Sequence, residues 1–198
     1  MHDLAIIGAG PAGMTALLYA TLYGLDAICI GDHIGGKLNL APDIHDYPGI
    51  PLIKGTAVIE GLSAQLKSVN QSVVVDEVVR IVNNQNHFVL TTRNGANLDA
   101  ETILFATGNG NKQKENQVAR LAIPLGVVVE KGLLVVDSGY MTGIQGIFAC
   151  GDCVVYPYSL EQLVTAVSGG ACAAATIYEY LEQTPPPIFW GKAQIKRI

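Results

Sequence analysis

The apolar positions of the first thirty residues predict a strand, a helix and a second strand. An apolar run at residues 4–7 leads into a glycine-rich turn at residues 8–13, a helical stretch continues to about Tyr23, and a second extended segment covers residues 26–30. Two strands joined by a tight turn and a helix form a βαβ unit. The chain therefore opens with the building block of a parallel sheet.

The hydrophobic pattern changes after this unit. Residues 31–54 form a loop rich in Gly and Pro, and the spacing of apolar residues over residues 58–66 predicts an amphipathic helix. Three segments rich in β-branched and aromatic residues follow, separated by Asn- and Gly-containing turns. We expect these segments to form an antiparallel β-meander: residues 73–75, 78–82 and 88–92.

The remaining pattern completes one α/β domain. Three short extended segments and a long helix of small residues are predicted at residues 103–106, 133–136, 147–149 and about 160–181. The prolines at 185–187 cannot continue that helix, because proline lacks the N–H and clashes with the preceding turn. We predict a Rossmann-like domain over residues 1–184, with a parallel sheet and an antiparallel meander, and a C-terminal tail over residues 185–198.

Composition limits the classes of function. Of 198 residues, 49% are hydrophobic and 15% are charged, without an uninterrupted apolar run of membrane-spanning length, so we expect a folded protein with no membrane partner. The net charge of −5 is not offset by a basic cluster, which argues against nucleic acid as a partner. Four cysteines are too few for a disulfide framework, and the opening apolar run is too short for a signal peptide. We expect reduced thiols, a cytoplasmic location and no metal site.

The segment Gly8-Ala9-Gly10-Pro11-Ala12-Gly13 matches the dinucleotide-binding fingerprint, directly after a strand and at the start of a helix. The first glycine permits the tight turn, the second lets the backbone approach a diphosphate, and the third lets helix and strand pack closely. The helix N-terminus attracts the phosphate charge. The sequence therefore predicts a dinucleotide cofactor.

A ribose-binding acid is expected about twenty positions after this turn. That position is Gly31, with Asp32 beside it. Asp32 either binds the ribose after a small shift or is a solvated loop residue, in which case backbone and water hold the ribose.

Further motifs make the chain resemble the thioredoxin reductase-like flavoproteins. These motifs follow the family's order and span most of the sequence: Gly8 to Gly13, Gly35-Gly36-Lys37-Leu38, Asp46-Tyr47-Pro48-Gly49, Ala106-Thr107-Gly108, Gly146-Ile147-Phe148-Ala149-Cys150-Gly151-Asp152 and Glu161-Gln162. The resemblance implies an FAD-binding domain. It also implies the residues that contact FAD: Gly8, Gly10, Pro11, Ala12, Gly13, Asp32, Gly36, Lys37, Leu38, Asp46, Val78, Ala106, Thr107, Gly108, Gly151, Asp152, Gln162 and Leu163.

The resemblance assigns roles to two of these regions. It implies that Asp152 hydrogen-bonds the ribityl chain of FAD, and that the backbone at Gln162 and Leu163 faces the flavin pyrimidine. A helix N-terminus at that place stabilises the negative charge of reduced flavin.

The chain also departs from the family pattern. Such flavoproteins carry a nicotinamide-binding domain, usually with a redox-active Cys-x-x-Cys, between the Ala-Thr-Gly strand and the Gly-Asp strand, whereas residues 109–150 here provide only 42 positions. A βαβ unit alone takes about thirty residues and a nucleotide-binding domain on the order of a hundred. We therefore expect a short crossover at residues 109–132 in place of the NADPH domain.

Three charged residues are further departures. Lys37 and Asp46 stand where the family pattern predicts an amide side chain, and Glu161 stands where it predicts arginine. Each of them changes the charge near the expected flavin and therefore its redox properties.

Cys150 and Cys153 match Cys-x-x-Cys and allow two interpretations. They are a low-ranked candidate for a redox dithiol, because reactive pairs commonly place the first cysteine at a helix N-terminus and this pair lies across a strand end. We favour buried structural thiols, as for Cys29 and Cys172. His45 is either a proton relay to flavin or, as we prefer, a surface loop residue.

The tail raises a similar choice, because Phe189 and Trp190 follow a stiff proline spacer. One hypothesis is that one of them, with Trp190 as our candidate, covers the flavin of its own chain or of a partner by ring stacking. The other is that both pack on the domain or across a dimer interface.

The function expected from these residues is that of an FAD-binding oxidoreductase which takes electrons from a separate donor. Two alternatives stay open. One is an FAD subunit whose nicotinamide domain lies on another chain, and the other is a non-catalytic FAD module or a chain from which the nicotinamide domain was deleted by design. The resemblance further implies a homodimer.

Overall fold

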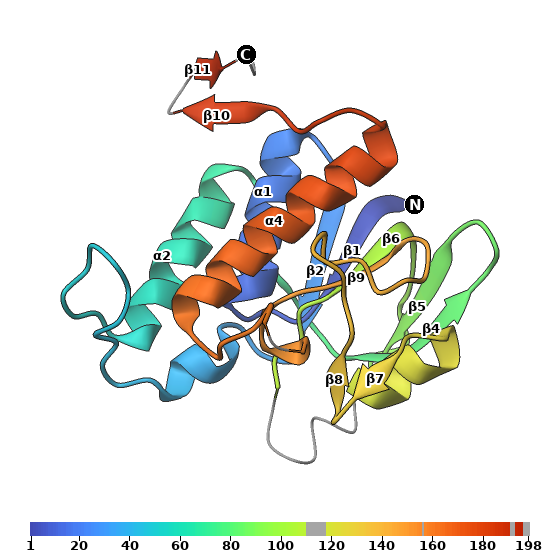
Figure 1. Ribbon diagram of the computed structural model, residues 1–198, viewed down its shortest axis with the longest axis horizontal. Helices are drawn as coiled ribbons and strands as arrows, with labels where there is room; N and C mark the ends of the chain where they lie inside the picture. Colours follow the sequence, from blue (N-terminus) through green and yellow to red (C-terminus); the bar gives the residue numbers. More distant parts are fainter. Residues whose placement is uncertain (110–117, 156, 191–192, 196–198) are drawn as a thin grey trace.

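A mixed sheet forms the centre of the molecule in the computed structural model, which describes all residues except 110–117, 156, 191–192 and 196–198. Its strands are β1 (His2–Ile7), β2 (Ala27–Gly31), β3 (Val74–Val75), β4 (Val78–Asn83), β5 (Phe88–Thr92), β6 (Asn97–Phe105) and β9 (Ile147–Ala149). Within the described residues the order is β3-β2-β1-β6-β5-β4, and β9 pairs with β6 (Figure 1).

The parallel half of the sheet arises from the predicted βαβ unit, which the structure confirms. β1 pairs in parallel with β2 on one side and with β6 on the other. Side chains alternate between the faces of a strand, so Leu4 and Ile6 enter the core on one face and Ala5 and Ile7 enter the core on the other. Burial on both faces explains why β1 is a continuous apolar run.

Three helices cover one face of the sheet: α1 (Pro11–Tyr23), α2 (Gly55–Ser68) and α4 (Leu163–Glu182). Figure 1 shows α1 between α2 and α4, and α1 contacts both. Small residues allow α1 and α4 to come close: a Cβ at Gly170 would lie 2.2 Å from the carbonyl oxygen of Ala12. The predicted helix over residues 58–66 is confirmed as part of α2.

The opposite face carries the chain that joins β6 to β9. Residues 118–122 are helical, and η2 (Ile123–Leu125), β7 (Val129–Glu130) and β8 (Leu133–Leu134) follow. Val118, Leu121 and Leu134 are buried there in the second apolar core. The expected crossover at residues 109–132 is therefore a packed layer from residue 118 onward, and residues 110–117 lie outside the described part of the chain.

Two expectations about the strands were wrong. β3 does not belong to the meander, because it pairs in parallel with β2 through Ile30↔Val74 and Gly31↔Val75. The antiparallel strands are β4, β5 and the first half of β6. β6 also begins at Asn97, six residues before the predicted start at Ile103. Its first half pairs with β5 and its second half with β9, so one long strand joins the antiparallel and parallel parts.

The C-terminal region differs from the prediction in two further respects. α4 begins at Leu163 instead of Leu160. The tail is not a single extended spacer, because β10 (Ile188–Trp190) and β11 (Ala193–Ile195) pair as an antiparallel hairpin. Figure 1 shows this hairpin beside the C-terminal ends of α1 and α4.

Candidate functional site

The three fingerprint glycines occupy three different environments in the turn between β1 and α1. Gly8 has a φ of +114°, and a Cβ there would lie 2.4 Å from the carbonyl oxygen of Ala106 on the neighbouring strand. A Cβ at Gly13 would lie 1.9 Å from the carbonyl oxygen of Gly8. A Cβ at Gly10, in contrast, would meet no atom within 4 Å. Gly8 and Gly13 are therefore required by packing, whereas Gly10 borders open space.

Helix α1 begins at this open space. Gly10 is its N-cap and provides no side-chain hydrogen bond, and Pro11 occupies the first turn. The first backbone N–H groups of a helix have no partner within the helix, and they carry the positive end of its dipole. The turn thus offers an anion backbone donors without a side chain in the way.

The loop after β2 contacts the same turn. Gly35 donates its backbone N–H to the carbonyl oxygen of Ala9 at 2.7 Å, and a Cβ at Gly36 would lie 3.5 Å from the Cα of Gly10. Gly36 opens the short helix η1 (Gly36–Leu40), in which Leu38 is buried. The structure therefore brings Gly36 to the fingerprint turn, and Leu38 lies buried two residues further along the same short helix.

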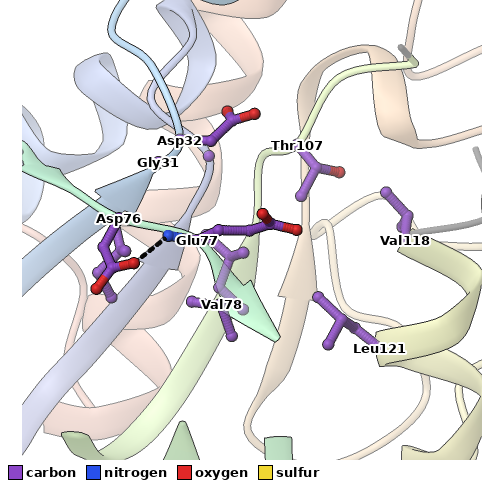
Figure 2. Close-up of a pocket in the computed structure, with 11 residues that line it drawn as sticks. Gly31, Asp32, Asp76, Glu77, Val78, Thr107, Val118 and Leu121 are labelled. Carbon is purple, nitrogen blue, oxygen red and sulfur yellow. Dashed lines mark hydrogen bonds between the residues drawn. The ribbon is translucent and has the colours of Figure 1, made fainter. Parts of the chain in front are cut away.

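A hollow opens on the other side of the turn. It is open to solvent, and its lining includes the predicted residues Gly8, Asp32, Val78 and Thr107. Figure 2 shows Asp32 at the end of β2 and Thr107 on the adjacent wall. The Asp32 carboxylate lies 2.7 Å from Nδ1 of His33.

The sequence interpretation missed several lining residues of this hollow, among them Asp76, Glu77, Val118 and Leu121. Asp76 and Glu77 follow β3, and the carboxyl ends of parallel strands are where ligands of α/β proteins bind. Placing β3 in the parallel sheet would have pointed to both. Figure 2 shows Glu77 reaching into the hollow, opposite Val118 and Leu121.

Hydrogen bonds fix the carboxylates of Asp76 and Glu77, the two acidic residues that follow β3. The Asp76 carboxylate accepts a hydrogen bond from the backbone N–H of Glu77 at 2.7 Å, and a hydrogen bond from the Thr92 hydroxyl is the main cause that lowers the pKa of Asp76. Arg93 donates Nε to the Glu77 carboxylate at 2.7 Å. Glu77 is therefore fixed beside the hollow by a cation.

A second polar group lies beyond the carboxyl ends of β6 and β9. The Lys37 ammonium is 3.8 Å from the Asp152 carboxylate and 3.7 Å from the Glu161 carboxylate. It also donates a hydrogen bond to the side-chain oxygen of Asn109. We call Lys37, Asn109, Asp152 and Glu161 the lysine cluster.

Asp152 is the most buried charged residue of the lysine cluster, with a side chain that is 17% exposed. It lies in η3 (Gly151–Cys153), directly after β9. Burial raises the pKa of its carboxyl, the Lys37 ammonium lowers this pKa, Glu161 raises it, and the hydrogen bond from the Ser159 hydroxyl lowers it. Asp152 lies close to the start of α1, because a Cβ at the preceding residue, Gly151, would lie 2.8 Å from the Cβ of Ala12. Its carboxylate is therefore an acceptor at the edge of the fingerprint turn.

Helix α4 directs its N-terminus to the same region. Gln162 is its N-cap and makes no side-chain capping hydrogen bond, and Leu163 is its first residue. Glu161 precedes the cap with a φ of +54°, in the left-handed region that side chains rarely adopt. A second set of helix donors therefore stands next to the lysine cluster.

Two predicted loop residues lie apart from these contacts. Asp46 and His45 are both exposed on the connection between η1 and α2. The roles assigned to Asp46 and His45 therefore stay predictions.

The Cys-x-x-Cys pair is buried. Cys150 is 0% exposed and Cys153 is 1% exposed. Cys153 directs its thiol to the carbonyl oxygen of Cys150 at 3.1 Å. Burial raises the pKa of Cys153 to about 11 and the pKa of Cys150 well above its ordinary value. Both environments oppose the thiolate that redox chemistry needs.

The Phe189 ring, in the described part of the tail, lies away from the fingerprint turn of its own chain. Phe189 stacks on Tyr23, with ring centroids 6.0 Å apart and an angle of 24° between the planes. Tyr23 ends α1, whereas the turn precedes α1. The side chain of Trp190 lies outside the described part of the structure. For Phe189, the packing interpretation fits this geometry.

Among the described residues, no group of three or more His, Cys, Asp or Glu side chains is arranged to hold a metal ion. No helix in that part of the chain is long and apolar enough to cross a membrane.

Comparisons with known proteins agree with this geometry. Residues 2–117 match the family of pyridine nucleotide-disulphide oxidoreductases. The thioredoxin reductase of Rickettsia prowazekii (strain Madrid E) is 27% identical over 175 residues, which are 87% of this chain and 50% of that protein. Ferredoxin–NADP reductase 1 of Bacillus cytotoxicus is 34% identical over 116 residues, which are 56% of this chain and 33% of that protein.

The fold has its own counterpart among solved structures. The crystal structure of Lactococcus lactis thioredoxin reductase in the FR conformation superposes with a TM-score of 0.83 at 18% identity, over 93% of this chain and 100% of that chain. The chain spans about half the length of the curated thioredoxin reductases that it matches. The expected α/β fold class and the resemblance to the thioredoxin reductase-like flavoproteins are confirmed: this chain belongs to the pyridine nucleotide-disulphide oxidoreductase family.

Proposed function

We propose that the chain binds FAD and acts as an oxidoreductase that exchanges electrons with a separate donor. The observation that carries the proposal is the open space at Gly10, between two glycines that packing requires. A turn that only reversed the chain would not need glycine at this position, where the backbone φ of −77° suits any residue. A diphosphate approaching the N-terminus of α1 explains the missing side chain.

The surroundings of the turn fit the two halves of such a dinucleotide. The hollow next to Gly8 would receive the adenosine, with the carboxylates of Asp32 and Glu77 as acceptors for hydroxyl or amino groups. The flavin half would extend toward Asp152 and the N-terminus of α4. Donors at that helix terminus stabilise negative charge close to them.

Bound flavin would supply the reversible acceptance of electrons, and the protein would bind, orient and shield it. Asp152 holds an acceptor at one edge of the site, and the uncapped α4 terminus holds donors at another. Buried Cys150 and Cys153 are not placed to take part. The acceptor of the electrons is therefore expected outside this chain.

The source of the electrons is proposed on the same grounds. Residues 109–150 connect β6 to β9, and from residue 118 onward they pack against the sheet. A relative that is 34% identical over 56% of the chain is named for both ferredoxin and NADP. We propose a separate protein donor. The alternative, a nicotinamide domain on another chain, predicts a stable complex with a second Rossmann protein.

We also propose that two copies form a homodimer. Large apolar side chains are exposed before α2 and at the start of α4: Leu40, Ile50, Leu52, Leu160 and Val164. We expect these side chains to be covered when two copies associate. Sedimentation that gives only monomer at high protein concentration would contradict the dimer.

We propose a reducing compartment such as the cytoplasm, which the four free cysteines support.

The test of FAD binding is chemical identification of the cofactor. The purified protein is expected to be yellow and to release about one FAD per chain on denaturation, because the turn offers backbone donors for a diphosphate and the hollow beside it offers carboxylate acceptors. Release of FMN, or no flavin even after reconstitution with FAD, would refute the proposal. Circular dichroism on the same sample shows that the tested protein is folded.

A further inference from the structure

The lysine cluster lies where four segments of the chain converge. Lys37 comes from η1, Asn109 follows β6, Asp152 follows β9, and Glu161 precedes α4. The Lys37 ammonium contacts the side chains of all three others. The residue before Lys37, Gly36, touches Gly10 of the fingerprint turn. Within the described residues, the Lys37 ammonium is the cation of this group, and it lies beyond the strand ends, where ligands of α/β proteins bind.

The cluster is not built for stability. The side chains of Lys37 and Glu161 are 52% and 63% exposed. The Lys37–Glu161 pair, at 3.7 Å, joins two exposed groups and contributes little, because water screens the charges and ordering both side chains costs entropy. In the Lys37–Asp152 pair, at 3.8 Å, the carboxylate is 17% exposed but the half-exposed ammonium limits the contribution. Three chain segments nevertheless direct a carboxylate or an amide oxygen at one ammonium, which fixes its position. A fixed cation with little structural value indicates a ligand.

The charges of the site identify that ligand. Asp32, Asp152 and Glu161 place carboxylates around the turn and its flanks, whereas the Glu77 carboxylate is already paired with Arg93. A dinucleotide adds a diphosphate with two negative charges. Backbone donors of α1 offset part of this charge. We propose that Lys37 provides the countercharge for the diphosphate of the cofactor, with Asp152 and Glu161 holding its ammonium in place. The inference rests on the proposed function and adds a residue that acts by charge.

The test uses probes that separate the parts of the cofactor. Binding of FAD, ADP and adenosine is measured by calorimetry for the wild-type protein and for Lys37→Gln, Lys37→Arg and Lys67→Gln. Lys67 is an exposed lysine on α2 and serves as the matched control. Loss of a charge-assisted contact should weaken FAD and ADP by about tenfold or more in Lys37→Gln. Adenosine binding should stay unchanged.

Two further results belong to the expectation. Lys37→Arg should keep affinity within about threefold, because it keeps the charge. The affinity of Lys37→Gln for ADP should depend less on salt concentration than that of the wild-type protein, since one phosphate contact is gone. All variants should unfold within about 2 °C of the wild type, as expected for exposed charges.

Several outcomes would overturn the inference. Equal ADP affinities for Lys37→Gln and Lys67→Gln would remove the countercharge role, as would weaker FAD binding with unchanged ADP binding. Failure of the proposed function looks different: the wild-type protein itself would then bind neither FAD nor ADP. Binding of both by the wild type leaves the proposed function standing, whatever the variants show.

Discussion

In the turn after β1, two glycines are required by packing and a third leaves room for a ligand. Gly8 and Gly13 approach backbone atoms so closely that no Cβ fits, and these contacts hold β1, β6 and α1 together. Gly10 has room for a side chain on the protein side. The same residue type is therefore used for packing at two positions and for ligand access at one. This division gives a test in which fold and function separate.

Alanine substitution should affect these glycines in opposite ways. Gly13→Ala forces a Cβ against the Gly8 carbonyl, and overpacking of this kind should destabilise the fold by about 3 kcal/mol or more. Gly10→Ala should cost about 1 kcal/mol or less, since alanine is only a poorer N-cap. It should nevertheless weaken FAD binding at least tenfold by blocking the diphosphate. Urea unfolding and calorimetry measure the two effects, and tight FAD binding by Gly10→Ala would contradict the proposed pose.

The Asp152 carboxyl provides a second test at this scale, through pH. Burial raises its pKa in the folded protein, so the folded state favours the protonated form. Its contribution to stability is then fully present below the unfolded pKa of about 3.9 and is lost as pH rises through the folded pKa. At pH 7 the ionised carboxylate is a cost that Asp152→Asn removes.

The flavin-free Asp152→Asn protein should therefore be as stable as the wild type at pH 7 or more stable, by up to about 1 kcal/mol. This difference should shrink to zero as the pH approaches 4, while FAD binding weakens at every pH. Thermal unfolding between pH 8 and pH 4 measures it, and Asp43→Asn on an exposed loop is the control. A variant that is less stable than the wild type only at high pH would reverse the sign and contradict the argument.

At the scale of elements, the sequence correctly predicted the strands and helices that leave a local pattern of apolar residues and glycines. The run at residues 4–7 and the glycine spacing identified β1, α1 and β2, because burial on both faces and a tight turn leave local signals. The partner of β3 was misjudged, since two exposed valines look alike in a meander and at the edge of a parallel sheet. That misjudgement concealed Asp76 and Glu77 as lining residues of the hollow.

Contacts between residues far apart in the chain could not be predicted from the sequence, because they leave no local pattern. The start of β6 was missed because Asn97 and Asp99 have low strand propensity, and pairing with β5 overrides it. The meeting of Lys37 with Asp152 and Glu161 joins residues more than a hundred positions apart. Their presence as departures from a family pattern was visible in the sequence, but their contact was not.

The tail hairpin offers a prediction at the element scale. Phe189 is 37% exposed and stacks on Tyr23, so Phe189→Ala should destabilise the protein by about 1 kcal/mol. The flavin fluorescence and the rate of reoxidation by oxygen should stay at wild-type values, because the stack lies at the far end of α1 from the turn. Val128→Ala, at a site that is 55% exposed and outside the proposed dimer surface, is the control for stability. Brighter flavin in Phe189→Ala would instead support a cover supplied by the tail.

At the scale of the whole molecule, one sheet separates two layers with different tasks. Helices α1 and α4 lie on one face and bring their N-termini to the carboxyl ends of the strands, where the fingerprint turn and Asp152 lie. The connection between β6 and β9 seals the other face and contributes Val118 and Leu121 to the hollow. Both layers therefore serve the proposed FAD site. Residues 118–150 pack against the sheet, so they are not available to form a second nucleotide site.

This arrangement leads to a prediction about the electron donor. Hydride transfer requires the nicotinamide ring to be held against the flavin, and such positioning provides several powers of ten in rate. The interval between β6 and β9 holds 42 residues, too few for a nucleotide domain of on the order of a hundred residues. In anaerobic titrations, NADPH and NADH should therefore reduce the flavin over minutes or not at all, more slowly than the range of about 1 to 1,000 per second that is typical of enzymes.

Dithionite should reduce the flavin completely, which shows that the flavin can accept electrons. A reduced iron–sulfur protein should reduce it faster than either nicotinamide. Rapid and saturable reduction by micromolar NADPH would show that the chain, alone or as a dimer, holds a nicotinamide site, and the proposal of a separate donor would then fall.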